Sequence, residues 1–186
     1  MPPPILATNS TVLSPYVTLV DRRVEIDGRE QSFHGMAVAD YVNVLAIARD
    51  GRVALVEQFR PMIGRSTLEL PGGHRDPGED PAATARRELH EETGLIAGAV
   101  SQMCVLSPDP ARLTNRFWGY VARDCAPDPG WRPEPDTRAS LVEPAQLAAL
   151  VAEGRFDNAP HVALYALAIA GGLLPPTVPA RQTEPK

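Results

Sequence analysis

The sequence predicts an α/β (α+β) fold in which one mixed sheet is packed by helices, and three observations favour it. Segments rich in β-forming residues come first, one helical segment is inserted among them, and helical patterns return near the end of the chain. This order differs from a repeating βαβ fold, in which strands and helices alternate throughout. A chain of 186 residues is long enough for one catalytic domain with a buried core.

The composition argues against a membrane protein, a secreted protein and a nucleic-acid-binding protein. No apolar run approaches the roughly 18 residues that span a bilayer, and the start, MPPPILATNS, lacks the pattern of a secretory signal. We therefore expect a cytoplasmic protein without membrane contact, in which Cys104 and Cys125 are reduced and buried. The net charge of −5 argues against a broad basic surface for nucleic acid. An anionic substrate would need local cations or a metal ion.

The N-terminal part predicts a β-hairpin. The first fifteen residues are rich in proline and small polar types, which predicts a loosely held terminus. The stretches YVTLVDRRVEIDG and EQSFHGMAVA then alternate around Asp27-Gly28, a dipeptide favoured in tight turns. Residues 1–40 are thus expected to form an N-terminal extension and hairpin, residues 41–172 the main domain, and residues 173–186 a flexible tail.

The main domain begins with strands and ends with helices. The runs VNVLAIAR and RVALVEQF flank Asp50-Gly51 and predict two central strands. Two further strands, AVSQMCVL and RFWGYVAR, are separated by SPDPARLTN, whose prolines exclude it from a central strand. A helical pattern runs from Pro144 to a stop near Gly154, and another runs from about Asn158 to Ala170.

Between these strands, the segment GHRDPGEDPAATARRELHEETGL predicts a helix. Asp80 is a good N-cap, and proline at position 81 suits the first helical position. Gly94 suits the left-handed residue that ends a helix. Residues 81–92 therefore form a predicted three-turn helix with an apolar stripe that contains Ala85 and Leu89.

Three glutamates on this helix are candidate metal ligands and catalytic groups. Glu88, Glu91 and Glu92 stand at i, i+3 and i+4, so their carboxylates share one face. Like charges one turn apart destabilise a helix by roughly 0.2–0.5 kcal/mol per pair, and a bound divalent cation would reverse this effect. Oxygen ligands without cysteine or paired histidine favour Mg²⁺ or Mn²⁺ over Zn²⁺. An isolated ExxEE motif is more often only a solvated helix face, so the surrounding residues decide between the two interpretations.

The surrounding residues resemble the Nudix box, G-x5-E-x7-R-E-U-x-E-E-x-G-U with U aliphatic. The match is complete, at Gly73, Glu79, Arg87, Glu88, Leu89, Glu91, Glu92, Gly94 and Leu95. Accidental agreement at the seven positions that demand one residue type, each used at roughly 7%, is on the order of one in 10⁸. The resemblance implies the Nudix α/β/α sandwich, with the box as loop, helix and loop. It also implies hydrolysis of the pyrophosphate bond in a nucleoside diphosphate linked to another moiety.

Within the box, four residues have expected structural roles. Gly73 and Gly94 shape the loops on either side of the helix. Arg87 lies one turn before Glu91, so we expect it to orient a carboxylate rather than to touch substrate. Glu79 is either a charge partner or an outer metal ligand.

The stretch VALVEQFRPMIGRSTLELPGG is similar to that of ADP-ribose pyrophosphatases, which commonly read VEQxR and then ELPAG or ELPGG. This resemblance implies that the Gly72 carbonyl and the box glutamates bind the metal. It also implies that Arg60 and Glu69 bind substrate, although Arg60 taken alone could equally be a surface arginine. A proline some fifteen or sixteen residues past the box marks ADP-ribose hydrolases, and Pro110 lies sixteen past Gly94.

The best substrate prediction is ADP-ribose, hydrolysed to AMP and ribose 5-phosphate. The sequence Ser107-Pro108-Asp109-Pro110 departs from the usual serine-proline-glycine of that loop, so base and sugar preference stay open. GDP-mannose or another nucleotide sugar, a nucleoside triphosphate and a dinucleoside polyphosphate are alternatives. A non-catalytic nucleotide-binding module is a remote one.

The resemblance also implies a general base and a dimer. In these relatives a glutamate on a loop before the C-terminal helices activates water, and WRPEPDTRAS offers Glu134 and Asp136. Glu134 is the first choice. Glu91 is the alternative base, and the loop could be only a linker. A homodimer through the N-terminal strands, about residues 16–37, is expected by the same resemblance.

Overall fold

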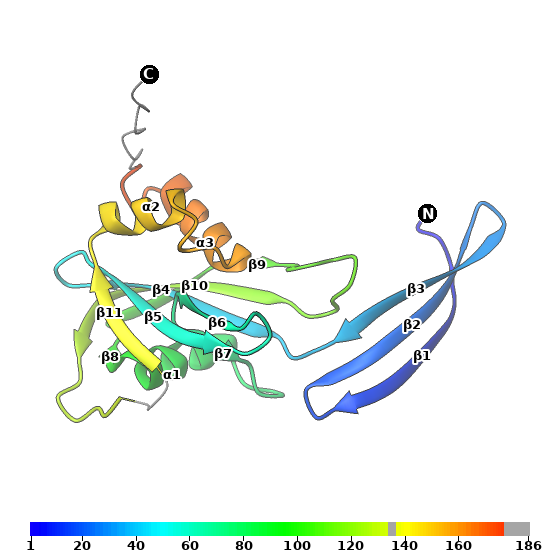
Figure 1. Ribbon diagram of the computed structural model, residues 1–186, viewed down its shortest axis with the longest axis horizontal. Helices are drawn as coiled ribbons and strands as arrows, with labels where there is room; N and C mark the ends of the chain where they lie inside the picture. Colours follow the sequence, from blue (N-terminus) through cyan, green and yellow to red (C-terminus); the bar gives the residue numbers. More distant parts are fainter. Residues whose placement is uncertain (134–136, 177–186) are drawn as a thin grey trace, which may run out of the picture.

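A computed structural model describes residues 1–133 and 137–176. In chain order its elements are β1 (Ile5–Ser14), β2 (Val17–Ile26), β3 (Arg29–Ala37), β4 (Tyr41–Ala48), β5 (Val53–Arg60), β6 (Arg65–Glu69), β7 (Gly72–His74), α1 (Pro81–Thr93), β8 (Leu95–Ile96), β9 (Ala99–Leu106), β10 (Phe117–Pro127), β11 (Thr137–Val142), α2 (Pro144–Ala152) and α3 (Ala159–Ala170). The predicted mixed α/β sandwich is confirmed, because α2 and α3 cover one face of the large sheet and α1 covers the other (Figure 1).

The large sheet has eight strands, and two strands that follow each other in the sequence, β4 and β5, diverge within it. Its order is β11-β5-β4-β10-β8, with β6 on β5, β7 on β4 and β9 on β10. The strands β4 and β5 follow each other around the predicted Asp50-Gly51 turn, yet they pair only at Ile47 and Val53. Beyond that point β5 pairs with β6 and β4 pairs with β7, so residues 65–74 lie between the diverging strands. This places Gly72 and Gly73 beside α1.

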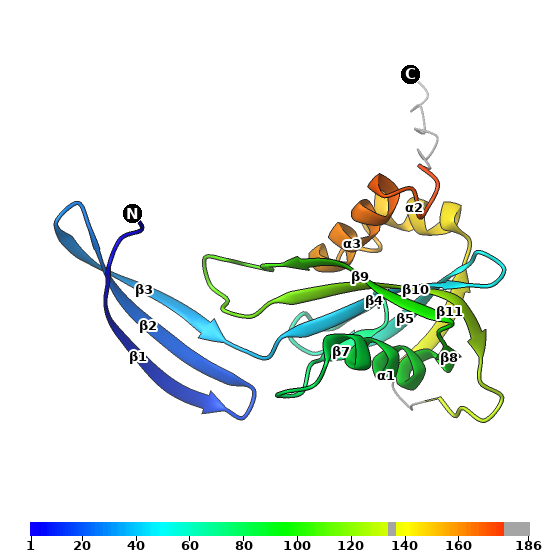
Figure 2. The ribbon, with the colours of Figure 1, turned by 180° about the vertical axis from the view of Figure 1, so that it is seen from behind.

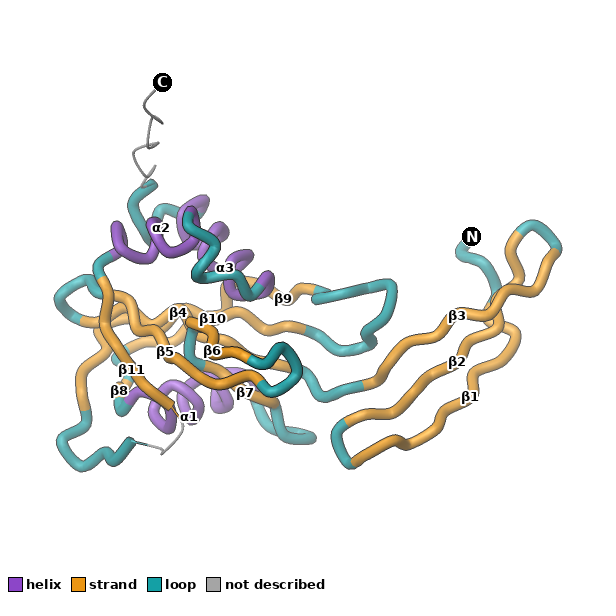
Figure 3. The backbone as a smooth tube through the Cα atoms, viewed as in Figure 1, coloured by secondary structure: helices purple, strands orange, loops and turns teal. Residues whose placement is uncertain are grey.

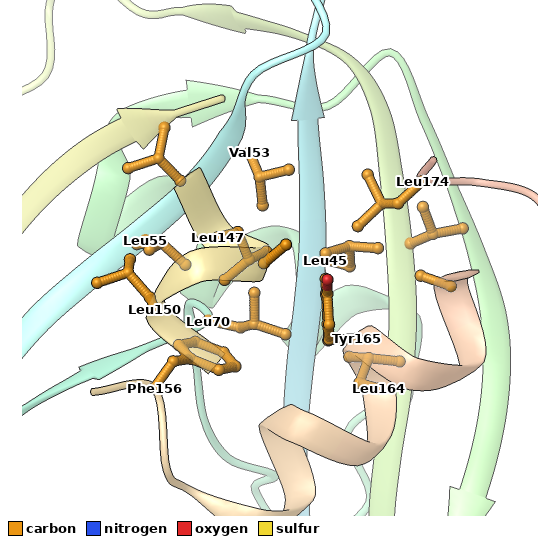
Figure 4. Close-up of a cluster of buried hydrophobic side chains, with 14 of the residues drawn as sticks. Leu45, Val53, Leu55, Leu70, Leu147, Leu150, Phe156, Leu164, Tyr165 and Leu174 are labelled. Carbon is orange, nitrogen blue, oxygen red and sulfur yellow. The ribbon is translucent and has the colours of Figure 1, made fainter. Parts of the chain in front are cut away.

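The core consists of two apolar layers, one on each face of the large sheet. On β4, Leu45 belongs to the layer under α2 and α3, whereas Val44 and Ala46 belong to the layer under α1. Figure 4 shows the first layer, in which Leu45 is surrounded by side chains of α2, α3 and the neighbouring strands. A strand buried on both faces carries a nearly continuous apolar run, as VNVLAIA does.

The N-terminal strands form a separate three-stranded sheet, which lies at one end of the molecule (Figure 2). The β2–β3 hairpin turns at Asp27 and Gly28, whose φ angles are 51° and 72°. The expectation of a loosely held terminus was wrong, since residues 5–14 pair with β2 as a third strand. Most side chains of β1 are exposed, so no buried apolar stripe distinguishes it in the sequence. The 107–116 loop contacts this sheet, where the Met36 N–H donates to the Arg112 carbonyl at 2.7 Å.

The C-terminal helices α2 and α3 match the predicted segments within one or two residues. Residues 177–186 of the predicted tail lie outside the described residues. In the two described ranges, none of the helices is both long and apolar enough to cross a membrane. Cys104 is half-buried, Cys125 is buried, and both are free thiols.

Replacing Gly94 by alanine tests the end of α1. Gly94 has φ 68°, and an added Cβ would come within 2.5 Å of the Trp131 ring. We expect Gly94→Ala to lower the free energy of unfolding by about 2–4 kcal/mol, measured by urea denaturation. Gly154 is the matched control, because its φ is 67° but nothing lies within 4 Å of its added Cβ. Gly154→Ala should cost only about 1 kcal/mol, and equal losses in the two variants would contradict the contact with Trp131.

Candidate active site

Helix α1 is fixed at both ends and along one face. The Asp80 side chain accepts the Ala82 N–H at 3.2 Å, and Gly94 ends the helix in the left-handed conformation. Ala85 and Leu89 are fully buried against the large sheet. The helix therefore has one orientation, and it directs the next face of its surface toward β7.

Glu92 lies on that face and is nearly buried, with 8% of its surface exposed. The Gly72 N–H donates to Glu92 Oε2 at 2.8 Å, and the Gln58 amide donates to Glu92 Oε1. Burial raises the pKa of Glu92 to about 7, although the hydrogen bonds from Gly72 and Gln58 oppose the shift. A desolvated carboxylate of this kind gains from a nearby cation.

Glu88 lies one turn earlier and faces the same glycine pair. Its carboxylate lies against Gly73, where any added Cβ would collide with it. A larger residue at position 73 would therefore displace the Glu88 carboxylate. Burial raises the pKa of Glu88 as well, and Arg87 opposes that shift.

Arg87 holds three carboxylates together. Its Nη1 donates to Glu88 at 2.7 Å and to Glu91 at 3.0 Å, while Nη2 and Nε each lie 3.2 Å from Glu79. The hydrogen bonds from Arg87 lower the pKa of Glu79 to about 2. Arg87 thus orients carboxylates, Glu79 is its charge partner, and Glu91 is turned outward with 46% of its side chain exposed.

Arg60 and Glu69 form a pair on the opposite wall. Nε and Nη2 of Arg60 donate to the two oxygens of Glu69 at 2.8 and 2.6 Å, and Thr67 donates to Glu69 at 2.5 Å. Burial acts to raise the pKa of Glu69, but hydrogen bonds from Arg60 and Thr67 outweigh it and the pKa is lowered. The Glu69 side chain is only 2% exposed. Glu69 therefore holds Arg60 through both of its carboxylate oxygens.

His161 of α3 ties the C-terminal helices to the same segment. It is 1% exposed, and its Nδ1 accepts the Leu70 N–H at 2.9 Å. Burial lowers the pKa of His161 to about 4, so the ring is neutral at pH 7. Sequence reasoning missed this residue, and the one available signal was a histidine within an otherwise apolar helix.

These groups surround a cleft of about 420 Å³ between α1, β5 and β7. The predicted residues in its walls are Arg60, Gly72, Gly73, Arg87, Glu88 and Glu92, and the others are Tyr41, Gln58, His74 and Asp76. The Tyr41 hydroxyl donates to the Gly72 carbonyl at 3.1 Å, and burial raises the pKa of that hydroxyl to about 12. The sequence signals for Tyr41 and Gln58 were weak, because each is an ordinary strand residue by pattern.

Other predicted site residues lie apart from the cleft walls. Glu91 and Glu79 pair with Arg87 and are not among the residues that line the cleft. Pro110 lines a different cavity, beside the N-terminal sheet. Glu134 and Asp136 lie outside the described residues.

The donor set of the cleft suits a hard divalent cation. Glu88, Glu92 and the Gly72 carbonyl are oxygen ligands, and Mg²⁺ typically binds one or two carboxylates together with substrate phosphates. Across residues 1–133 and 137–176, however, no three side chains of Asp, Glu, His or Cys form a group that could hold a metal. The expected ridge of three glutamates is therefore divided, because Arg87 holds Glu88 and Glu91 while Gly72 and Gln58 hold Glu92.

Comparison with known proteins identifies the family to which this chain belongs. A family model described as "NUDIX domain" matches residues 39–165. The chain belongs to the Nudix family. Nudix hydrolases generally use divalent metal ions, in agreement with the oxygen donors of the cleft.

Named relatives of this Nudix chain include two bacterial enzymes. The ADP-ribose pyrophosphatase of Bacillus subtilis is 39% identical over 96 residues, which cover 52% of this chain and 50% of that protein. The ADP-ribose pyrophosphatase of Mycobacterium tuberculosis is 31% identical over 162 residues, 85% of this chain and 73% of that protein. A crystal structure titled as an ADP compounds hydrolase has a TM-score of 0.79 at 24% identity, with 91% and 95% of the two chains covered, and it supports the fold. The chain spans about half the length, or less, of the first curated relatives it matches.

Stability at acidic pH tests the buried His161. The unfolded chain takes up a proton near pH 6.5, whereas the folded chain takes it up near pH 4. The contribution of neutral His161 is therefore complete above pH 6.5 and is lost as the pH falls through 4. The variant His161→Asn keeps an acceptor for the Leu70 N–H. We expect its free energy of unfolding to fall by about 1–3 kcal/mol less than that of the wild type between pH 7 and pH 4. Urea unfolding at both pH values measures this difference, and identical losses would mean that His161 does not titrate as described.

Proposed function

We propose that this chain is a Mg²⁺-dependent pyrophosphohydrolase, with Mn²⁺ as a possible substitute, that cleaves ADP-ribose to AMP and ribose 5-phosphate. The observation that carries the proposal is the cleft in which Glu88, Glu92 and the Gly72 carbonyl lie opposite Arg60. Oxygen ligands for a divalent cation thus face a guanidinium that suits phosphate oxygens. Two named relatives, described above, are ADP-ribose pyrophosphatases.

Each wall of the cleft has its own task in this mechanism. Glu88, Glu92 and the Gly72 carbonyl would hold the metal, which supplies polarisation of the phosphoryl group and a lower pKa for bound water. Arg60 binds the diphosphate through Nη1, because Glu69 already engages Nε and Nη2. Water attacks one phosphorus, the bond to the bridging oxygen breaks, and the two phosphate products separate.

The attacking water needs a base, and we assign this role to Glu134, with Glu91 as the alternative. The residues that flank positions 134–136 support the choice. Trp131 Nε1 donates to the Glu91 carbonyl at 3.0 Å, and Thr137 pairs with Gln58, a cleft residue. Residues 131 and 137, on either side of this segment, thus contact α1 and a residue of the cleft wall, which supports a base from this segment.

We also propose that the protein is a homodimer that pairs through its N-terminal sheet. This sheet projects from the body as an almost free unit (Figure 3). Its exposed apolar side chains include Ile5, Leu6, Val12, Leu13, Tyr16 and Phe33. Exposed apolar side chains gathered on one small sheet are candidates for a protein contact.

Carboxylate variants test the catalytic proposal. We expect Glu92→Gln to abolish Mg²⁺ binding and to lower kcat/KM for ADP-ribose by about 10³-fold or more, because a principal ligand is lost. Glu134→Gln should lose turnover to a similar degree but keep Mg²⁺ binding. Turnover is measured by the release of AMP, and metal binding by calorimetry.

The control is Glu153→Gln, an exposed glutamate that follows the last residue of α2, which should leave both readouts unchanged. Near-normal turnover in Glu92→Gln, or turnover that survives EDTA, rules out the metal assignment. If Glu91→Gln is inactive while Glu134→Gln remains active, the base is Glu91.

A panel with GDP-mannose, Ap4A and nucleoside triphosphates decides whether ADP-ribose is the preferred substrate.

The dimer is tested by charge on the N-terminal sheet. Val12→Lys combined with Leu13→Lys places charges on both faces of β1, where the side chains are 74% and 61% exposed. We expect the molecular mass measured by sedimentation to change from that of a dimer to that of a monomer. The control pair, Met62→Lys with Ile63→Lys, is similarly exposed at 95% and 56% but lies in the β5–β6 turn, so it should remain dimeric. A monomeric wild type would overturn the assignment.

A further inference from the structure

The loop between β7 and α1, residues 75–80, leads into the helix that carries the glutamates. Within this loop, the Glu79 carboxylate accepts hydrogen bonds from Nε and Nη2 of Arg87. Nη1 of the same arginine donates to Glu88. The position of the Glu88 carboxylate therefore depends on where the loop places Glu79.

Arg75 joins this loop to the large sheet. On the loop side, its Nε donates to the Glu79 carbonyl at 2.7 Å. On the sheet side, its Nη1 lies 3.5 Å from Asp40 Oδ2, and its guanidinium carbon lies 5.7 Å from the centre of the Trp118 ring. A guanidinium can serve these partners together, because its donors have fixed directions and its face stacks on an aromatic ring.

Asp40, the partner of Arg75 on the sheet side, is itself fixed. Its Oδ1 accepts the Arg116 N–H at 2.8 Å, and its Oδ2 accepts the indole N–H of Trp118 at 2.9 Å. Its carbonyl accepts the Arg75 N–H at 2.9 Å, which extends the pairing of β4 with β7 by one residue. Both the backbone and the side chain of Arg75 are therefore attached to a well-held part of the sheet.

The contacts of Arg75 indicate that it holds the loop and does not bind substrate. Of the described residues, those that line the cleft include its neighbour Asp76 but not Arg75. Its Nε and Nη1 already have partners in the protein. Arg60, in contrast, lies in the cleft wall, so it is the arginine placed to meet phosphate oxygens.

We propose that Arg75 is a positioning residue for the metal site, which acts on Glu88 through Glu79 and Arg87. The inference rests on the proposed function, since it takes Glu88 as a metal ligand. Arg75 fixes the backbone at Glu79, and the Glu79 carboxylate then aligns the Arg87 guanidinium. In this alignment Nη1 of Arg87 is directed at Glu88. Without Arg75, the loop loses its side-chain tie to the sheet, and the alignment is lost with it.

The variant Arg75→Ala tests the proposal. We expect the Mg²⁺ dissociation constant, measured by calorimetry, to rise about tenfold or more, because contacts that support a metal ligand typically change metal affinity 10–100-fold. The Mg²⁺ concentration that gives half-maximal turnover of ADP-ribose should rise by the same factor. At saturating Mg²⁺, KM for ADP-ribose should stay within about twofold of the wild-type value, because no substrate contact is removed.

The variant Arg75→Lys separates positioning from charge. Lysine keeps the positive charge but lacks the planar fork, so it does not join Asp40 to the Glu79 carbonyl as arginine does. We expect it to bind Mg²⁺ as weakly as Arg75→Ala does. Wild-type Mg²⁺ affinity in Arg75→Lys overturns the proposal, because the charge alone would then be sufficient. This outcome also decides the question if Arg75→Ala does not unfold cooperatively in urea.

A double-mutant cycle tests the route through Glu79. In a Glu79→Ala background, Arg75→Ala should change Mg²⁺ affinity by less than about twofold, since the two residues act in one chain of contacts. The full effect of Arg75→Ala in that background overturns the route.

The matched control is Arg52→Ala. Arg52 also pairs with a nearby carboxylate, that of Asp50 at 2.7 Å, but it lies at the β4–β5 turn and is not among the described residues that line the cleft. This variant should bind Mg²⁺ as the wild type does. Equal Mg²⁺ affinity in Arg75→Ala and Arg52→Ala overturns the positioning role.

Mg²⁺ binding and turnover together distinguish this inference from the proposed function. If the wild type and Arg75→Ala bind Mg²⁺ equally well, the positioning role is refuted and the proposed function is not. If Arg75→Ala loses Mg²⁺ affinity but the wild type does not hydrolyse ADP-ribose, the proposed function is refuted and the positioning role is not. A wild type that does not bind Mg²⁺ overturns both.

Discussion

The hydrogen bond from the Gly72 N–H to the buried Glu92 carboxylate is the contact on which the site depends. It joins a helix that packs on one face of the sheet to a short segment inserted between two strands of that sheet. The contact is possible only because β4 and β5 separate after one pair of residues and leave room for residues 65–74. If the two strands paired along their whole length, Gly72 would have no position beside α1.

The same segment is held from the opposite face of the sheet. His161 of α3 accepts the Leu70 N–H, and Tyr41 donates to the Gly72 carbonyl. Residues 70–72 thus have partners on α3, on β4 and on α1, which fixes the backbone groups directed at the cleft. Glu69 extends this support to Arg60, whose planar side chain would otherwise be free to rotate at the surface. Such supporting contacts determine how accurately a site is arranged.

The sequence predicted the backbone better than it predicted side-chain partners. The ends of α1 follow from Asp80 and Gly94, and the hairpin follows from Asp27-Gly28, because these signals act within a few residues. Strand β1 escaped prediction since its side chains stay exposed and leave no apolar periodicity. Spacing placed three glutamates on one helix face and Arg87 one turn before Glu91, but it could not show that Glu92 turns to Gly72. Gly72 belongs to a different segment of the chain, and for the same reason the contact of His161 with Leu70 was visible only in the fold.

The charges of this network explain why a cation belongs in the cleft. Glu69, Glu79, Glu88, Glu91 and Glu92 are balanced within the network by only two arginines, Arg60 and Arg87. Arg87 is already shared among three carboxylates, so it has little capacity left for phosphate. Burial raises the pKa of Glu88 and Glu92, so their negative charge is disfavoured without a partner. A divalent cation in the cleft would favour the ionised form of both carboxylates and would present positive charge to an anionic substrate at the same place. The arrangement therefore suits an anionic substrate only when metal and substrate occupy the cleft together.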